Sequence, residues 1–163
     1  MEDRRIRRMV PYSTDIAPST DSVESTSLVS KWLNRCSEKH SDCKKAFSET
    51  SFVPSRLIEI RGTTEGDLKA RLREKGQISN ETCYTTLSHC WGTTVPFRLL
   101  SSNKKALLTD VPLSALSKVF KDAILLTWRL NIRYVWIDSL CELIRPRHDH
   151  RTEEVRHHPR LRR

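Results

Sequence analysis

Two segments of the chain carry apolar residues at helical spacing. Residues 28–45 place such residues three and four positions apart, which predicts a helix with one apolar stripe. The stripe consists of Val29, Trp32, Leu33, Cys36, His40 and Cys43. Residues 113–130 show the same period more clearly, with charged side chains mostly on the other faces. Asn131 follows directly and is typical of a helix C-terminal stop.

Four shorter segments have strand patterns. Residues 56–60 (RLIEI) alternate Leu57 and Glu59 with Ile58 and Ile60, as strand residues on opposite faces do. Residues 83–90 (CYTTLSHC) are rich in β-branched and aromatic side chains. Residues 68–74 (LKARLRE) have strand period, although the residues themselves favour helix. Residues 133–138 (RYVWID) are apolar on both faces, as in a strand buried in a parallel sheet. The strand, helix and buried strand from 83 to 138 predict a βαβ unit, and hence an α/β fold with a parallel sheet.

The positive charge of the chain lies mainly near its two ends. The formal net charge is +9 over 163 residues, of which residues 1–8 carry +2 and residues 145–163 carry +4. The basic segment at 145–163 also lacks the aromatic side chains that stack on bases. A folded basic groove is therefore not indicated, and nucleic acid is not an expected partner.

The remaining bulk features favour a cytoplasmic protein with free thiols. Five cysteines make an odd number, and the N-terminal residues lack the apolar stretch of a secretory signal. No run approaches the ~18 apolar residues that a membrane span requires. Residues 1–26 are rich in Ser, Thr, Asp and Pro without periodicity, which is typical of a disordered leader.

The segment TLSHCWGTT (86–94) gathers reactive side chains at the end of a predicted strand. Adjacent strand residues point to opposite faces, so Ser88 and Cys90 share one face and His89 takes the other. A local nucleophile–base pair is therefore disfavoured. Gly92 permits a tight turn after the strand, and Trp91 either lines a pocket or fills the core.

A second group of candidates follows the apolar run YVWI. Asp138, Ser139 and Cys141 come after this strand, and ligands of open α/β sheets bind beyond the carboxyl ends of parallel strands. Asp138 there either binds a ligand hydroxyl, accepts a proton or caps the following turn. We expect any chemistry where the two strand ends meet, around Ser88, Trp91, Asp138 and Cys141.

Cys36, His40 and Cys43 raise the question of a metal site. One helix would place them on the same side, at positions i, i+4 and i+7. Structural zinc sites usually take a closely spaced ligand pair from a turn, which such a helix lacks. The same stripe contains Trp32 and Leu33, and buried cysteine packs as a small hydrophobe. The sequence therefore favours packing, and no metal is expected.

Four stretches of the sequence resemble the fungal heterokaryon-incompatibility (HET) domain. They are WLNRCSEKHSDC (32–43), RLIEI (56–60), YTTLSHCWG (84–92) and FKDAILLTWRLNIRYVWIDSLC (120–141), in the order found in the family. The last is similar to the family's Phe-x-Asp-Ala-Ile helix, Arg-Leu-x-Ile-Arg-Tyr turn and Trp-Ile-Asp-Ser-Leu-Cys strand end. The positions that match these motifs are Ser88, Trp91, Gly92, Asp122, Arg129, Arg133, Asp138, Ser139 and Cys141.

The resemblance implies a cytoplasmic fungal protein of nonself recognition, which triggers programmed cell death when incompatible cells fuse. Other HET or incompatibility proteins are the implied partners. The family has been likened to flavodoxin-like Toll/interleukin-receptor domains, some of which cleave NAD, so NAD enters by analogy alone. The alternatives are a non-catalytic module that pairs with a full-length HET protein and, less favoured, a basic nucleic-acid-binding protein.

The resemblance covers residues 28–141 and breaks off after Cys141. The family usually continues with an apolar pair, Gln-Asp and an acidic stretch, where this chain reads ELIRPRHDHRTEEVRHHPRLRR (142–163). We expect a basic disordered tail there that begins at a shifted reading frame, a retained intron or a mispredicted exon. The chain would then hold a partial domain with an open sheet edge at 133–138, inactive by itself.

Overall fold

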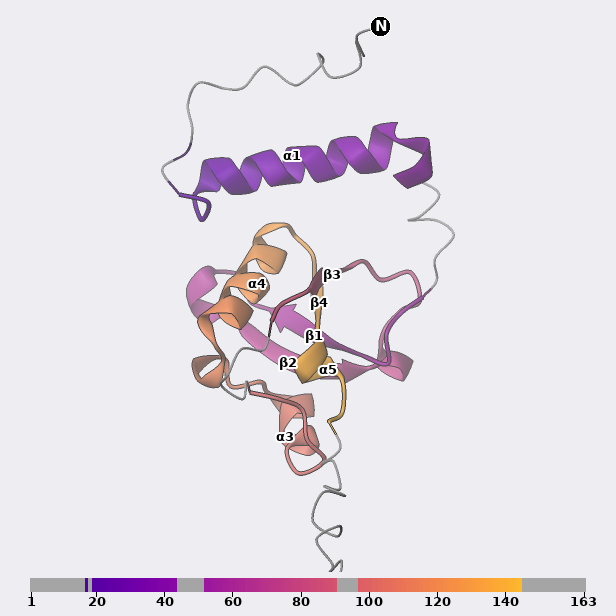
Figure 1. Ribbon diagram of the computed structural model, residues 1–163, viewed down its shortest axis with the longest axis vertical. Coiled ribbons are helices and arrows are strands. Elements are labelled where there is room, and N and C mark those ends of the chain that lie inside the picture. Colours follow the sequence, from indigo (N-terminus) through magenta and orange to yellow (C-terminus); the bar gives the residue numbers. More distant parts are fainter. Residues whose placement is uncertain (1–16, 18, 44–51, 91–96, 145–163) are drawn as a thin grey trace, which may run out of the picture.

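The computed structural model describes residues 17, 19–43, 52–90 and 97–144. A four-stranded sheet lies at its centre, with helices around it (Figure 1). The strands are β1 (Arg56–Arg61), β2 (Lys69–Glu74), β3 (Tyr84–Leu87) and β4 (Tyr134–Ile137). The helices are α1 (Val23–Lys39), α3 (Lys104–Thr109), α4 (Lys118–Arg129) and α5 (Asp138–Cys141). The α/β fold class expected from the sequence is confirmed.

The sheet is mixed rather than parallel throughout, with the strand order β2-β1-β4-β3. β3 and β4 are parallel and α4 lies between them in the chain, which confirms the predicted βαβ unit. β1 runs antiparallel to both of its neighbours, β2 and β4. The connection between β1 and β2 is too short for a parallel pair, which needs a crossover of a dozen or more residues.

The expectation of an open sheet edge at 133–138 is wrong, because β4 lies between β1 and β3. Val135 pairs with Ile58 of β1 on one side and with Thr85 of β3 on the other. Both Val135 and Ile137 are buried, which explains the apolar sequence of this strand. The two edges of the sheet are β2 and β3.

Pairing with β1 decides the structure of β2, whose residues individually favour helix. Ala70 and Leu72 are fully buried, while the residues that alternate with them, Lys69, Arg71 and Arg73, carry charges toward solvent or toward Glu59 of β1. The main core lies against this face and includes Phe120 and Ile124 of α4. Each side chain of this size contributes roughly 1.5–3 kcal/mol when it is fully buried. Tertiary burial therefore outweighs local propensity in β2.

The boundaries of α4 follow from its caps. The Ser117 side chain accepts a hydrogen bond from the Phe120 amide at 3.4 Å, so the helix begins five residues later than predicted, after a 3-10 turn at Leu113–Ala115. Asn131 has a φ of 58°, a left-handed conformation that asparagine tolerates, which confirms the predicted stop. The short helix α3, which contacts β2, has no counterpart in the sequence prediction.

α1 begins and ends earlier than expected. The Ser22 side chain accepts a hydrogen bond from the Ser25 amide at 3.1 Å and starts the helix at Val23, inside the segment expected to be a disordered leader. The helix ends at Lys39, and residues 41–43 form a separate helical turn beyond His40. The single helix predicted over 28–45 is therefore two helical pieces with a break.

The apolar stripe of α1 is exposed, against expectation. None of the residues of α1 is buried, and the side chains of Trp32 and Leu33 are 56% and 43% exposed. The helix lies apart from the sheet layer in Figure 1. A helical period alone thus did not predict burial, because burial requires a partner surface.

Candidate functional site

The carboxyl ends of β3 and β4 bring a histidine and an aspartate together. Leu87 lies opposite Ile137 in the parallel pair, so the chain leaves both strands at the same edge of the sheet. His89 Nδ1 lies 3.7 Å from Asp138 Oδ1, with the two side chains 12% and 31% exposed. A histidine and a carboxylate at this position can bind a polar ligand or transfer a proton.

Packing holds the His89 ring in place. It meets Phe120 of α4 edge-on, with ring centroids 4.9 Å apart and an angle of 89° between the planes. Neither ring nitrogen has a hydrogen-bond partner within the described part of the chain. The 3.7 Å between His89 and Asp138 exceeds a hydrogen bond, and a movement of less than about 1 Å would form one. Buried polar atoms without hydrogen-bond partners are uncommon in proteins, so the two ring nitrogens of His89 are candidates for binding a ligand.

Asp138 is the first residue of α5. Its Oδ1 accepts a hydrogen bond from the Ser139 amide at 2.6 Å, and its carbonyl accepts one from the Glu142 amide at 2.8 Å. The same oxygen atom that binds the Ser139 amide faces His89. Local backbone contact therefore fixes the direction of the carboxylate toward the imidazole.

Ser139 and Cys141 lie behind this pair, in the core. The Ser139 hydroxyl is buried and has no hydrogen-bond partner within the described ranges. Burial raises the pKa of the Cys141 thiol to about 12, although the Ile137 amide donates a hydrogen bond to its sulfur at 3.5 Å. Cys141 is thus protonated at neutral pH and is not an activated nucleophile. We assign it a packing role.

A hollow of about 570 Å³ opens beside Cys141, away from the histidine. Its lining includes Phe52, Arg56, Trp136 and Leu143. The Arg56 guanidinium donates a hydrogen bond to the Cys141 carbonyl at 2.7 Å, which closes part of this surface. Of the described residues predicted to surround a pocket, Cys141 lines this one, and Ser88 and Asp138 do not.

The strand-end motif itself is only partly described. Ser88 and Cys90 are exposed and His89 is largely covered, which agrees with the predicted alternation of faces. Trp91 and Gly92 lie outside the described residues. The two roles predicted for Trp91, lining a pocket or filling the core, therefore stay predictions.

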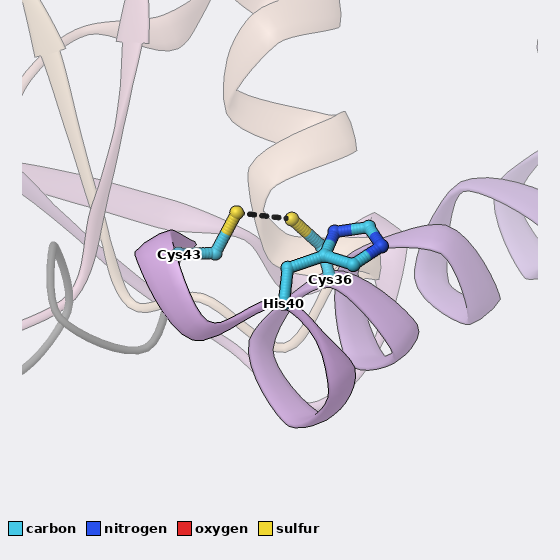
Figure 2. A group of neighbouring side chains, drawn as sticks. All are labelled: Cys36, His40 and Cys43. Atoms are coloured by element: carbon cyan, nitrogen blue, oxygen red, sulfur yellow. Dashed lines mark hydrogen bonds between the residues drawn. The ribbon is translucent and has the colours of Figure 1, made fainter.

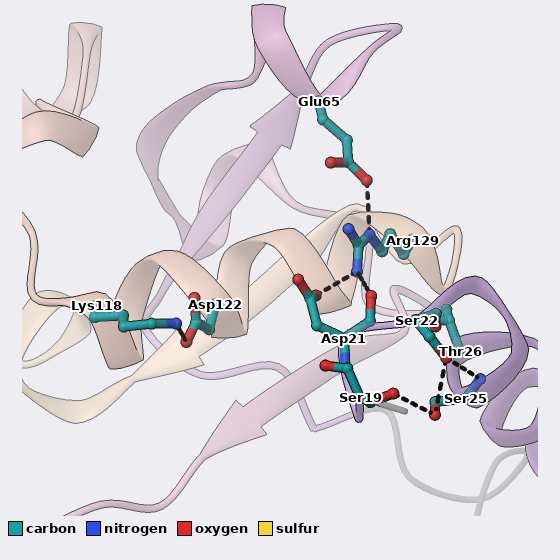
Figure 3. A network of polar contacts seen from close by, with 9 residues as sticks. All are labelled: Ser19, Asp21, Ser22, Ser25, Thr26, Glu65, Lys118, Asp122 and Arg129. Carbon is teal, nitrogen blue, oxygen red and sulfur yellow. Dashed lines mark hydrogen bonds and ion pairs between the residues drawn. The ribbon is translucent and has the colours of Figure 1, made fainter. Parts of the chain in front are cut away.

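Two of the helix motif residues make surface contacts (Figure 3). The Arg129 guanidinium binds Glu65 at 2.7 Å and the carboxylate of Asp21 at 2.5 Å, and these bonds raise the pKa of Arg129. It thereby joins α4 to the 3-10 turn Glu65–Asp67 and to the residues before α1. Asp122 pairs with Lys118 at 2.6 Å, one turn away on the exposed face of α4. Neither residue reaches the His89–Asp138 pair through the contacts described.

Arg133 is part of a buried charge cluster on the opposite face of the sheet from α4. Glu59 of β1 is only 1% exposed and accepts hydrogen bonds from Arg133 and from Arg71, the latter at 2.5 Å. Arg73 lies 3.6 Å from the same carboxylate. Burial raises the pKa of Glu59, but the two arginine hydrogen bonds outweigh burial and lower it overall. Arg133 therefore serves to neutralise a buried acid.

The sequence alone does not indicate His89 as a site residue. Its partner Asp138 is far away along the chain, and adjacent residues of the strand could not supply one. The alternation of Ser88, His89 and Cys90 along the strand predicts that His89 lies on the opposite face from the other two, and this is the feature that points to it. A second group, Cys36, His40 and Cys43, also comes together, with all three ligand atoms within 4.8 Å of one another.

The described part of the chain contains an α/β unit of two parallel strands with a His–Asp pair at their carboxyl ends. Residues 84–158 match the family described as Heterokaryon incompatibility protein (HET), which confirms, for this part of the chain, the resemblance seen in the sequence. The match starts at the first residue of β3 and continues past Cys141. No curated protein and no solved structure matches the chain. Within the described ranges, no helix is long and apolar enough to cross a membrane.

Proposed function

We propose that the chain acts as a fungal nonself-recognition effector that promotes cell death, and that His89 and Asp138 form its functional centre. The HET family match places the chain in the context of heterokaryon incompatibility. One observation carries the further step: the matched region contains a His–Asp pair at 3.7 Å, at the edge of the sheet where α/β domains bind ligands.

The chemistry assigned to this pair is ligand binding with proton transfer. His89 accepts a proton from a ligand hydroxyl or a water molecule, and the Asp138 carboxylate stabilises the imidazolium that results. A closed geometry with a direct hydrogen bond belongs to the bound state, since catalytic contacts often tighten only with substrate. Hydrolysis of NAD, the reaction suggested by analogy, would break the N-glycosidic bond with water as the attacking group and release nicotinamide, ADP-ribose and a proton.

Regulated expression in fungal cells tests this proposal. The HET match continues past Cys141 to residue 158. Against the expectation of a partial domain that is inactive by itself, we therefore expect the chain to reduce viability, and His89→Ala and Asp138→Asn to restore it at equal protein level. Asp110→Asn is the matched control, because it changes an exposed aspartate of the matched region that belongs to none of the family motifs. Killing by the wild type that both site variants retain would overturn the role of the pair, and absence of killing by the wild type would overturn the effector role.

The exposed apolar side of α1 favours a second candidate, a non-catalytic module that pairs with a complete HET protein. Leu28, Trp32 and Leu33 are 45%, 56% and 43% exposed on this helix. Co-purification with a full-length relative that depends on Trp32 but not on His89 would favour this role. Loss of NAD in the presence of the purified chain, dependent on His89, would favour an enzyme.

A further inference from the structure

The end of α1 brings together two thiols and an imidazole that the sequence pattern had assigned to helix packing. The ligand atoms of Cys36, His40 and Cys43 all lie within 4.8 Å of one another. The two sulfur atoms face each other and the His40 ring lies beside Cys36 (Figure 2). We propose that these three residues bind a thiophilic divalent cation, with Zn²⁺ as the physiological representative.

The break in the helix creates this arrangement. His40 has extended backbone angles (φ −100°, ψ 115°), and its amide bonds the Cys36 carbonyl at 3.2 Å. The chain turns there and the helical turn at 41–43 returns Cys43 toward Cys36, with 2.9 Å between the sulfurs. His40 and Cys43 therefore form the closely spaced ligand pair from a turn that structural zinc sites use and that a continuous helix would lack.

Packing does not account for the cluster. No residue of α1 is buried, Cys36 and Cys43 are only half-buried, and His40 is exposed. Cys36 and Cys43 therefore do not fill a core together with Trp32, and the packing role predicted for them is wrong. Two cysteines and a histidine on a surface, with their ligand atoms turned toward one point, fit coordination better than burial.

Metal chemistry fits the donors and needs only small movements. Zn–S and Zn–N bonds of about 2.3 and 2.0–2.1 Å imply ligand atoms about 3.4–3.8 Å apart in a tetrahedron. The sulfurs would separate by about 1 Å and the imidazole would approach by a similar distance. The Cys36 sulfur and burial raise the pKa of the Cys43 thiol, and a cation between the sulfurs would hold both as thiolates.

Three ligands leave a fourth coordination position. Within the described part of the chain, no fourth histidine, cysteine or acid belongs to the cluster. Water or a group from outside the cluster would complete the tetrahedron. The cluster lies outside residues 84–158, so the proposal of a metal site does not depend on the proposed function, and either can fail without the other.

Cobalt substitution of the reduced, metal-free full-length chain tests the proposal. We expect one Co²⁺ per chain, sulfur-to-cobalt charge-transfer absorption, intense visible absorption of tetrahedral cobalt, and displacement by Zn²⁺. Cys36→Ser and Cys43→Ser should each weaken binding by more than the roughly 10–100-fold that loss of an outer-shell partner causes. His40→Ala should weaken it while the charge-transfer band persists.

The exposed cysteines of the same chain supply matched controls. Cys83→Ser and Cys90→Ser remove thiols outside the cluster and should leave stoichiometry and spectrum unchanged. Binding that is unaffected by Cys36→Ser and Cys43→Ser would overturn the proposal, and binding unaffected by His40→Ala would overturn the three-residue assignment. A reduced chain that takes up no cobalt and forms only a Cys36–Cys43 disulfide on oxidation would also overturn it.

Discussion

The helices α1 and α4 have similar patterns and opposite environments. Each begins at a serine whose side chain caps the helix, and each repeats apolar residues at helical spacing. α4 buries Phe120, Ile124 and Thr127 against the sheet, whereas α1 buries no residue. The comparison teaches that amphipathic period predicts a helix, and that only the neighbouring surface decides whether its apolar side forms a core.

Large-to-small substitutions should separate the two helices most clearly. Phe120→Ala removes a ring that is 1% exposed and should lower the free energy of unfolding by about 3–5 kcal/mol. Trp32→Ala changes a half-exposed side chain and should stay within about 0.5 kcal/mol. Urea unfolding followed by circular dichroism measures both. Equal losses would mean that α1 packs on the sheet in solution.

The buried acid of the sheet should show a larger pH-dependent effect on global stability than Glu24 of α1. The pKa of Glu24 is also lowered, by a backbone hydrogen bond and by Ser22, but no residue of its helix is buried. Because the pKa of Glu59 is lowered in the folded state, its stabilisation is present above the unfolded pKa of about 4.3 and disappears as the pH falls through the folded value. Glu59→Gln should cost about 1.5–3 kcal/mol at neutral pH, less in acid.

Glu24→Gln is the control for this charge effect, since Glu24 lies in the exposed first turn of α1. It should leave the unfolding midpoint unchanged at neutral pH. Denaturation curves at several pH values would test the pair. A constant difference between wild type and Glu59→Gln across the acid range would contradict the charge explanation.

The two serine caps allow a matched comparison of smaller size. Ser117→Ala should lower global stability by about 1 kcal/mol, because the fold depends on α4. Ser22→Ala removes the equivalent hydrogen bond from α1 and should increase hydrogen exchange of the Ser25 amide without moving the unfolding midpoint. A shift of the midpoint by Ser22→Ala would show that α1 unfolds together with the sheet.

Arg129 links the two regions and should give the smallest effect on stability. Arg129→Ala removes ion pairs with Glu65 and Asp21, both mostly exposed, so the loss should be below about 1 kcal/mol and should shrink at high salt. Hydrogen exchange at residues 22–26 should rise. Lys118→Ala removes another exposed pair of α4 and should leave that exchange unchanged.

The sequence predicts where the candidate site lies, at the carboxyl ends of β3 and β4, better than it predicts which residues form it. The sequence predicts Asp138 because an acid follows a strand that is apolar on both faces, and the parallel register of β3 and β4 then places both strand ends at one edge. The sequence does not predict His89, since its partner comes from the other strand. Arg133 and Arg129 were found through motifs, yet their contacts with Glu59 and Glu65 depend on the sheet and on a turn far away in sequence.

Local sequence by itself determined the βαβ unit, the stop of α4 at Asn131 and the HET motifs, because periodicity, left-handed turns and motif spacing are properties of neighbouring residues. Tertiary structure alone decided that β1 runs antiparallel to β4, that β4 lies inside the sheet, that His89 meets Asp138 and that α1 remains exposed. These outcomes depend on contacts between segments distant in the chain. The free energy of such contacts cannot be read from a local pattern of residues.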